Sequence, residues 1–213
     1  MDLTTSMGND PRIFNFQTSP PGIVRGNAVV GGWVFDNQSV GEPSGVVRAF
    51  DALSGEFAWA WDMGRPGVNT QPLRGEVYTR GTPNVWSLFS VDEELGLIYA
   101  PTGNETPDYF GGQRMESSEQ YASSIVAIDG ETGSVRWSYQ TTHHDLWDYD
   151  VPSQPVLIDL PGEDGEKIPA VLVPTKRAEV FVLNRVTGEP IFDIQELSVP
   201  QEGGVPEDYV AAT

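Results

Sequence analysis

Apolar residues occur along this chain in short runs that are bounded by Gly, Pro, Asp and Ser. Runs of about four to eight residues that are rich in Val, Ile and aromatic residues, and flanked by such turn formers, are typical of β-strands. No helical spacing of apolar residues extends beyond about two turns. The pattern therefore predicts an all-β fold. We expect strands at 28–35, 46–50, 86–91, 97–100, 124–128, 154–159, 169–173 and 179–183.

Three of the expected strands lead into the same short motif, which occupies residues 49–59, 127–137 and 182–192. In each copy an Asp or Asn ends the strand, Ser or Thr followed by Gly forms a turn, and an aromatic residue stands four positions after the Gly. The Asp or Asn side chain can accept hydrogen bonds from turn amides, and Gly readily adopts the positive φ of a tight hairpin. We expect the aromatic residue of each copy to pack against a neighbouring unit. The third copy, which ends in Phe192 instead of Trp, is the weakest match.

Hairpins that repeat in this way are typical of the blades of a β-propeller. The first two copies are farther apart than the last two, and the excess falls in residues 62–81, which we expect to form a long loop. A closed propeller needs more blades than 213 residues supply. We therefore predict a partial β-propeller of about three to four four-stranded antiparallel blades. Residues 1–213 are expected to be a fragment of a single propeller domain in a longer protein.

The composition disfavours several classes of partner. The chain has 12 Lys and Arg against 31 Asp and Glu, a formal net charge of −19, which disfavours nucleic acids and anionic membrane surfaces. The absence of Cys excludes thiolate metal sites and cysteine nucleophiles. The sequence contains no apolar run of about 18 residues that could span a membrane, and its first residues lack the features of a signal peptide. We therefore expect neither a nucleic acid nor a membrane surface to be a partner of this stretch of chain.

Residues 141–155 combine side chains that are too polar for a core strand and too aromatic for a solvated loop. A carboxylate in a partly desolvated place with aromatic walls can act as a general base. A surface turn anchored by a tryptophan is the alternative. Adjacent side chains diverge on a strand, so we do not expect the two histidines to bind a metal together. The stretch contains His143, His144, Asp145, Trp147, Asp148, Tyr149 and Asp150.

In combination with the three motif copies, three further stretches make the chain resemble the quinoprotein dehydrogenases, which are eight-bladed β-propellers that bind pyrroloquinoline quinone (PQQ). These are Tyr-Ala-Pro-Thr-Gly-Asn at 99–104, His-His-Asp-Leu-Trp-Asp-Tyr-Asp at 143–150 and Pro-Thr-Lys at 174–176. The residues around 36–48 and 106–111 resemble the membrane-bound glucose dehydrogenase type, which includes quinate/shikimate and other polyol dehydrogenases. The resemblance extends from about residue 18 to residue 196.

The resemblance implies roles for individual residues in cofactor binding and catalysis. Trp86 corresponds to the indole on which the quinone stacks, Lys176 to the cation that hydrogen-bonds the quinone oxygens, and Thr18 to a ligand of a PQQ carboxylate. Asp148 corresponds to the catalytic base, with Asp145 and Asp150 as rivals. For a Ca²⁺ or Mg²⁺ ion that acts as a Lewis acid, the resemblance implies oxygen ligands from Asp36, Asn37 and Asn104.

The function that the resemblance implies is PQQ-dependent oxidation of a sugar, polyol or cyclic alcohol by hydride transfer to the quinone. Electrons would pass to ubiquinone or another acceptor, in a periplasmic enzyme whose membrane attachment comes only through parts outside this fragment. The fragment alone is expected to be inactive. One alternative is a non-enzymatic propeller scaffold of outer-membrane assembly, and another is a methanol- or alcohol-type quinoprotein. The enzyme interpretation requires Trp86, Asn104, Asp148 and Lys176 to converge at one end of the blades.

Overall fold

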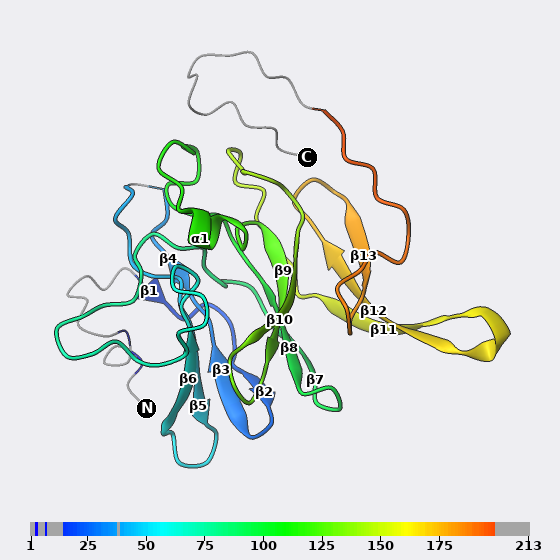
Figure 1. The fold of residues 1–213 in the computed structure, drawn as a ribbon, viewed down its shortest axis with the longest axis horizontal. Coiled ribbons are helices and arrows are strands. Elements are labelled where there is room, and N and C mark those ends of the chain that lie inside the picture. The colour runs from blue at the N-terminus through cyan, green and yellow to red at the C-terminus, as the bar shows by residue number, and fades with distance from the viewer. Residues whose placement is uncertain (1–2, 4–6, 8–14, 38, 199–213) are drawn as a thin grey trace.

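The computed structural model describes Leu3, Met7, residues 15–37 and residues 39–198, and it is an all-β structure (Figure 1). All strand pairs are antiparallel. The first sheet has the order β2-β3-β5-β6, with strands β2 (Gly22–Val24), β3 (Asn27–Val30), β5 (Val47–Asp51) and β6 (Phe57–Trp61). The second has the order β10-β9-β8-β7, with strands β7 (Ser90–Asp92), β8 (Leu97–Pro101), β9 (Ser124–Asp129) and β10 (Val135–Gln140).

The remaining elements are smaller. A third sheet of order β11-β12-β13 contains β11 (Val156–Pro161), β12 (Lys167–Pro174) and β13 (Val180–Asn184). A short ribbon pairs β1 (Asn15–Phe16) with β4 (Trp33–Val34). The helical segments are α1 (Glu116–Glu119) and the 3-10 turn η2 (Glu163–Gly165), so among the described residues no helix is long and apolar enough to cross a membrane.

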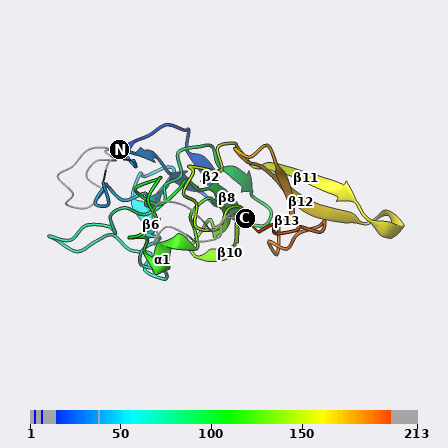
Figure 2. The same ribbon diagram turned by 90° about the horizontal axis from the view of Figure 1, so that it is seen from above.

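The three larger sheets follow one another along the chain and lie side by side in space (Figure 1). The first strand of each sheet lies next to the first strand of the following one, since β2 contacts β7 and β7 contacts β11. The β11–β12 hairpin extends beyond the rest of the molecule in both views (Figures 1 and 2). Consecutive antiparallel sheets whose first strands are neighbours form a sector of a β-propeller. The prediction of a partial propeller is confirmed.

The aromatic residues of the repeated motif join one sheet to the next. Trp59 in β6 donates its indole N–H to the carbonyl oxygen of Gly130 at 3.0 Å and lies directly over Gly133. Trp137 in β10 donates to the carbonyl oxygen of Arg185 at 3.2 Å and lies over Gly188 in the same way. Both contacts confirm that the aromatic residue packs against the neighbouring unit. The aromatic residue of the third copy, Phe192, is 62% exposed.

Two hydrophobic clusters fill the spaces between adjacent sheets. The first lies between the first and second sheets and includes Val24, Trp61, Ile98 and Ile128. The second lies between the second and third sheets and includes Leu97, Tyr99, Val171 and Leu183. The inner strands β8 and β9 are buried almost throughout, because their sheet is covered on both faces. This burial explains why these strands appear in the sequence as continuous apolar runs.

Two expected strands were only partly correct. The segment 28–35 is divided at Gly31 and Gly32 into β3 and β4, which belong to different sheets. A Cβ at Gly31 would lie 2.3 Å from the carbonyl oxygen of Val85, so two backbones pass too closely here for a continuous strand. Of the segment 86–91, only its last two residues are in a strand, because β7 begins at Ser90.

The third sheet has three strands where four were expected. The chain after Gly188 returns toward β13 and forms a bridge between Pro190 and Leu183, and Ile191 donates its N–H to Val182 at 2.9 Å. Proline has no N–H to continue the ladder, so the fourth strand is begun without being completed.

The expected long loop at 62–81 is present, and its base is closed by one buried carboxylate. Asp62 accepts hydrogen bonds from the Arg65 side chain at 2.9 Å and from the Thr79 backbone N–H at 2.9 Å. The loop is therefore fixed where it leaves and re-enters the sheet, whereas side chains farther out, such as Leu73, are exposed.

Candidate active site

The predicted site residues lie in loops that leave or enter the sheets. Asp36 follows β4, Trp86 precedes β7, Asn104 follows β8 and Lys176 follows β12. The loop that follows β10 carries Asp145, Asp148 and Asp150. These loops meet, because hydrogen bonds connect residues in them that are up to 68 positions apart in the chain.

An ion triad lies at the centre of the site. The Lys176 ammonium is 2.9 Å from Asp148 Oδ1 and 3.3 Å from Asp150 Oδ2. The Asp150 side chain is 8% exposed and that of Asp148 is 31% exposed. Burial raises the pKa of Asp150, and the Lys176 charge counteracts part of that rise. Burial also lowers the pKa of Lys176, but the two carboxylates outweigh it, so the pKa of the amine is raised overall.

Trp86 is held in place beside this triad. Its indole N–H donates to Asp150 Oδ2 at 3.0 Å, and the Lys176 ammonium lies 6.0 Å from the centre of its ring. The hydroxyl of Thr18 donates to the Trp86 carbonyl oxygen at 2.7 Å. Thr18, Trp86, Asp148 and Lys176 therefore form one group in space. Of the four residues that the enzyme interpretation requires to converge, Asn104 reaches this group through its backbone N–H, which donates to Asp150 Oδ1 at 2.6 Å.

The three aspartates of the 145–150 loop have different partners. Asp145 is fully buried and accepts hydrogen bonds from the N–H groups of Trp147 and Tyr149 and from the Ser123 hydroxyl, at 2.9, 2.6 and 2.7 Å. Its carboxylate thus folds the turn that holds Asp148 at φ +61°, a left-handed conformation that is uncommon for residues other than Gly. Asp150 accepts from the Asn104 N–H at 2.6 Å in addition to Trp86 and Lys176. Asp148 is the most exposed carboxylate of the three.

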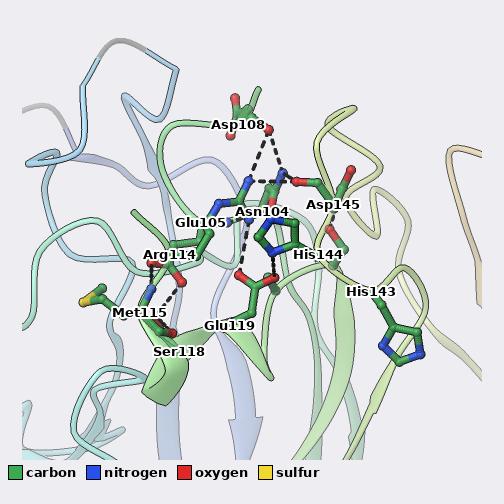
Figure 3. Close-up of polar contacts among 12 residues, drawn as sticks. Asn104, Glu105, Asp108, Arg114, Met115, Ser118, Glu119, His143, His144 and Asp145 are labelled. Atoms are coloured by element: carbon green, nitrogen blue, oxygen red, sulfur yellow. Dashed lines mark hydrogen bonds and ion pairs between the residues drawn. The ribbon is translucent and has the colours of Figure 1, made fainter. Parts of the chain in front are cut away.

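The two histidines point to different partners (Figure 3). His143 lies 2.9 Å from the Gln140 side chain and 3.1 Å from Glu196, whereas His144 lies 3.1 Å from Glu119. They do not converge on a common point. In this structure they contact the end of β10, the segment that follows β13 and helix α1.

The predicted cation ligands are separated into two hydrogen-bond networks. Asp36 is half-buried and accepts from the Asn84 side-chain N–H at 3.2 Å, and burial raises the pKa of Asp36. Asn37, next to it, is exposed. Asn104 is 1% exposed, and its side-chain oxygen accepts from Arg114 at 2.6 Å and from the Glu105 N–H at 2.9 Å (Figure 3).

Arg114 connects the Asn104 loop to the loop that carries Asp148. Its guanidinium side chain is 3% exposed and also donates to the Asp145 carbonyl oxygen at 2.7 Å. The side-chain N–H groups of Asn104 donate to the carbonyl oxygens of Asp145 at 2.8 Å and Asp108 at 3.1 Å. Figure 3 shows Arg114 and Asn104 together bridging these two carbonyls.

Sequence reasoning missed Asn84, Asp108 and Arg114. Asp108 is 5% exposed, and burial raises its pKa to about 8, with further contributions from the negative charges of Asp36, Asp150 and Asp148. Its position, two residues after Thr106 in a stretch that resembles the glucose dehydrogenase type, was the available signal. Arg114 follows Gly-Gly-Gln and has the sequence context of a surface loop, so nothing local indicates that it is buried.

The charge balance and the free oxygen atoms of this region fit a hard cation. Four carboxyl groups, those of Asp36, Asp108, Asp148 and Asp150, influence one another electrostatically around the Lys176 ammonium. The oxygens Asn84 Oδ1 and Asp108 Oδ1 are buried without a hydrogen-bond partner. Among the described residues, no three carboxylate or imidazole side chains are placed to hold a metal ion by themselves, so a cation here would also need amide or hydroxyl oxygens.

Comparisons with known proteins agree with this architecture. A family model described as "PQQ: Glucose/ethanol/alcohol dehydrogenase, beta-propeller domain" matches residues 1–213. The chain is 45% identical over 208 residues to the glycerol dehydrogenase large subunit of Gluconobacter oxydans, covering 98% of this chain and 28% of that protein. It is 46% identical over 187 residues to quinoprotein glucose dehydrogenase A of Acinetobacter calcoaceticus, and the match covers 87% of this chain and 23% of that protein.

Among solved structures, the quinohemoprotein alcohol dehydrogenase from Comamonas testosteroni superimposes with a TM-score of 0.65 at 26% identity. The match covers 90% of this chain and 30% of that one. The chain thus spans less than a third of the length of the proteins that it matches.

Proposed function

The chain belongs to the PQQ glucose/ethanol/alcohol dehydrogenase β-propeller family, and from this membership we propose that it forms part of the propeller of a dehydrogenase that oxidises a sugar, polyol or cyclic alcohol. The observation that carries the proposal is the contact of Lys176 with Asp148 and Asp150 beside Trp86. A scaffold without chemistry has no need to collect a cation, two carboxylates and an indole from three separate loops. The named relatives act on glycerol and glucose, which supports a polyol or sugar substrate.

Three side chains are proposed to hold PQQ, which supplies the two-electron oxidising power when it is bound. The Trp86 indole offers a planar surface for stacking, and its orientation is fixed by the hydrogen bond to Asp150. Lys176 would hydrogen-bond the quinone oxygens and stabilise negative charge on them. Thr18 would donate to a carboxylate of the cofactor in exchange for its present bond to the Trp86 carbonyl.

Asp148 is proposed as the base that accepts the proton of the substrate hydroxyl. Its side chain is 31% exposed, so a substrate can reach it, and Lys176 at 2.9 Å balances its charge. The turn organised by Asp145 fixes its backbone. Asp145 and Asp150 are poorer candidates, because both are buried and each accepts hydrogen bonds from neighbouring N–H groups.

We propose that a Ca²⁺ or Mg²⁺ ion binds beside Asp36, with Asn37 and Asn104 as the further ligands predicted from the sequence. Carboxylate and amide oxygens are the ligands that these ions prefer. In the structure the Asn104 oxygen already accepts two hydrogen bonds, from Arg114 and from the Glu105 N–H. Cation binding through that oxygen would therefore have to replace one of them.

The remaining parts of the proposal concern the whole protein. Electrons would leave the site for ubiquinone or another acceptor, and the site would face the periplasm. The proposed partners are small molecules, with no role for nucleic acid, in agreement with the formal net charge of −19.

The full-length protein that contains this chain, reconstituted with PQQ and Ca²⁺ or Mg²⁺, is expected to show dye-linked alcohol or sugar oxidation. Asp148→Asn should lower kcat by about 10²–10⁴-fold, the usual contribution of a general base, while PQQ binding measured by absorbance stays intact. Glu131→Gln, which changes an exposed turn residue, serves as the control. Turnover of Asp148→Asn close to that of the wild type would rule out Asp148 as the base.

A further inference from the structure

Asn84 forms a hydrogen bond with the predicted cation ligand Asp36, and its side-chain oxygen has no hydrogen-bond partner. The residue is 0% exposed. Its Nδ2 donates to Asp36 Oδ2 at 3.2 Å, whereas its Oδ1 is buried and accepts no hydrogen bond. A buried carbonyl oxygen that loses its hydrogen bonds to water costs about 1–3 kcal/mol, so such atoms usually have a ligand or a functional reason.

The orientation of the Asn84 amide is determined by Asp36. Exchanging Nδ2 and Oδ1 would place two hydrogen-bond acceptors against each other, because an ionised carboxylate has no proton to donate. The unsatisfied atom is therefore the oxygen, and it lies on the same amide group that touches the Asp36 carboxylate.

The backbone of Asn84 is held between two neighbouring segments of the chain. Its carbonyl oxygen accepts the Gly103 N–H at 2.7 Å, which ties it to the residue before Asn104. On another side it lies against Gly45, where a Cβ would be 2.6 Å from the Asn84 Cα. The side chain therefore extends from a fixed backbone position to the Asp36 carboxylate, which interacts electrostatically with Asp148 and Asp108.

We infer that Asn84 is an oxygen ligand of the proposed divalent cation, which it binds through Oδ1 together with the carboxylate of Asp36. The inference rests on the proposed function, since it concerns the cation of the same site. It assigns the amide ligand to a residue whose oxygen is free, whereas the Asn104 oxygen is occupied by Arg114 and Glu105. A cation would also relieve the cost of the unpartnered Asn84 oxygen.

The test is direct Ca²⁺ binding to the full-length protein without PQQ or substrate, measured by isothermal titration calorimetry. Asn84→Ala is expected to weaken Ca²⁺ binding by about 10–100-fold, as does Asp36→Asn. Asn69→Ala is the matched control, because Asn69 also donates its side-chain N–H to an oxygen acceptor, but that acceptor is the Thr132 carbonyl and Asn69 lies in the 62–81 loop. The affinity of the Asn69→Ala protein for Ca²⁺ should equal that of the wild type.

A second variant keeps the inference testable if Asn84→Ala does not fold. Asn84→Asp has nearly the same shape and adds a negative charge beside Asp36, so its melting temperature should be lower without Ca²⁺ and should rise more than that of the wild type when Ca²⁺ is added. An Asn84→Asp protein that gains no more from Ca²⁺ than the wild type overturns the inference.

The outcomes separate the inference from the proposal on which it rests. If Asp36→Asn or Asn104→Ala weakens Ca²⁺ binding while Asn84→Ala binds like the wild type, the Asn84 assignment is wrong and the cation site stands. If the wild type itself binds neither Ca²⁺ nor Mg²⁺, both are wrong.

Discussion

The contact of Trp59 with Gly133 joins the first sheet to the second, and replacing this glycine by alanine tests the contact directly. Gly133 has φ +74°, and a Cβ at this position would lie 2.5 Å from Trp59 Cε3 and 2.6 Å from Cδ2. Trp59 is 2% exposed and is hydrogen-bonded through its indole N–H, so it has little room to move. Gly133→Ala therefore introduces both backbone strain and a steric clash.

The two effects can be estimated separately. The left-handed conformation costs an L-residue about 1–2 kcal/mol. Overfilling a well-packed core typically costs about 1–3 kcal/mol, so the expected loss in the free energy of unfolding for Gly133→Ala is about 2–5 kcal/mol. Gly165, in η2 at the tip of the β11–β12 hairpin, has φ +80° with no atom within 4 Å of its Cβ position. Gly165→Ala should therefore cost only the energy of the left-handed backbone conformation.

Urea unfolding followed by tryptophan fluorescence measures the free energy of unfolding of the wild type, Gly133→Ala and Gly165→Ala under the same conditions. We expect Gly133→Ala to be less stable than Gly165→Ala by about 1–3 kcal/mol. Gly188→Ala, where a Cβ would lie 2.7 Å from Trp137 Cδ2, should behave like Gly133→Ala. Equal losses for Gly133→Ala and Gly165→Ala would show that the glycine is required for its φ angle alone and that our account of how the sheets are joined is wrong.

Two further predictions concern charged groups near the site. Lys176→Met leaves the Asp150 carboxylate uncompensated and should lower the free energy of unfolding in urea at neutral pH by roughly 1–3 kcal/mol. The loss should be smaller near pH 5, where Asp150 gains a proton because burial raises its pKa. Lys176→Arg is the control, and an unchanged stability of Lys176→Met would contradict the triad. Glu105 is 1% exposed, and burial raises its pKa from 4.5 to about 7, so the folded protein keeps a proton that the unfolded chain has lost. Glu105 should therefore contribute a fall in stability of up to about 3 kcal/mol as the pH rises from about 4.5 to about 7, and melting curves across that range should show a fall that is smaller by this contribution in Glu105→Gln.

The binding residues around Asn104 show where sequence reasoning reached its limit. The order of Trp86, Asn104, Asp148 and Lys176 matched a family pattern, and the structure brings Trp86, Asp148 and Lys176 together. Which atoms of these residues remain available was not predictable, because hydrogen-bond partners come from distant loops. Arg114, for example, reaches the Asp145 carbonyl across 31 positions of the chain.

The three aspartates of the 145–150 loop illustrate the same limit. Their spacing in the sequence gives no reason to separate them, since all three carboxylates fall within six consecutive positions. The fold assigns Asp145 to the turn amides and Asp150 to Trp86 and Asn104, leaving Asp148 as the exposed member. Burial and partner atoms, which decide how a carboxylate titrates, are properties of the packed loops.

The repeated turn, in contrast, was determined by the sequence itself. Asp51 and Asp129 accept hydrogen bonds from amides two and three residues later, and the following Gly55 and Gly133 both have φ +74°. These interactions span fewer than six residues, so the local sequence is sufficient to specify them. The tertiary structure decided which backbones pass too closely for a strand and which buried oxygens, such as that of Asn84, remain without a partner. Those features depend on contacts between segments far apart in the chain, which local sequence does not encode.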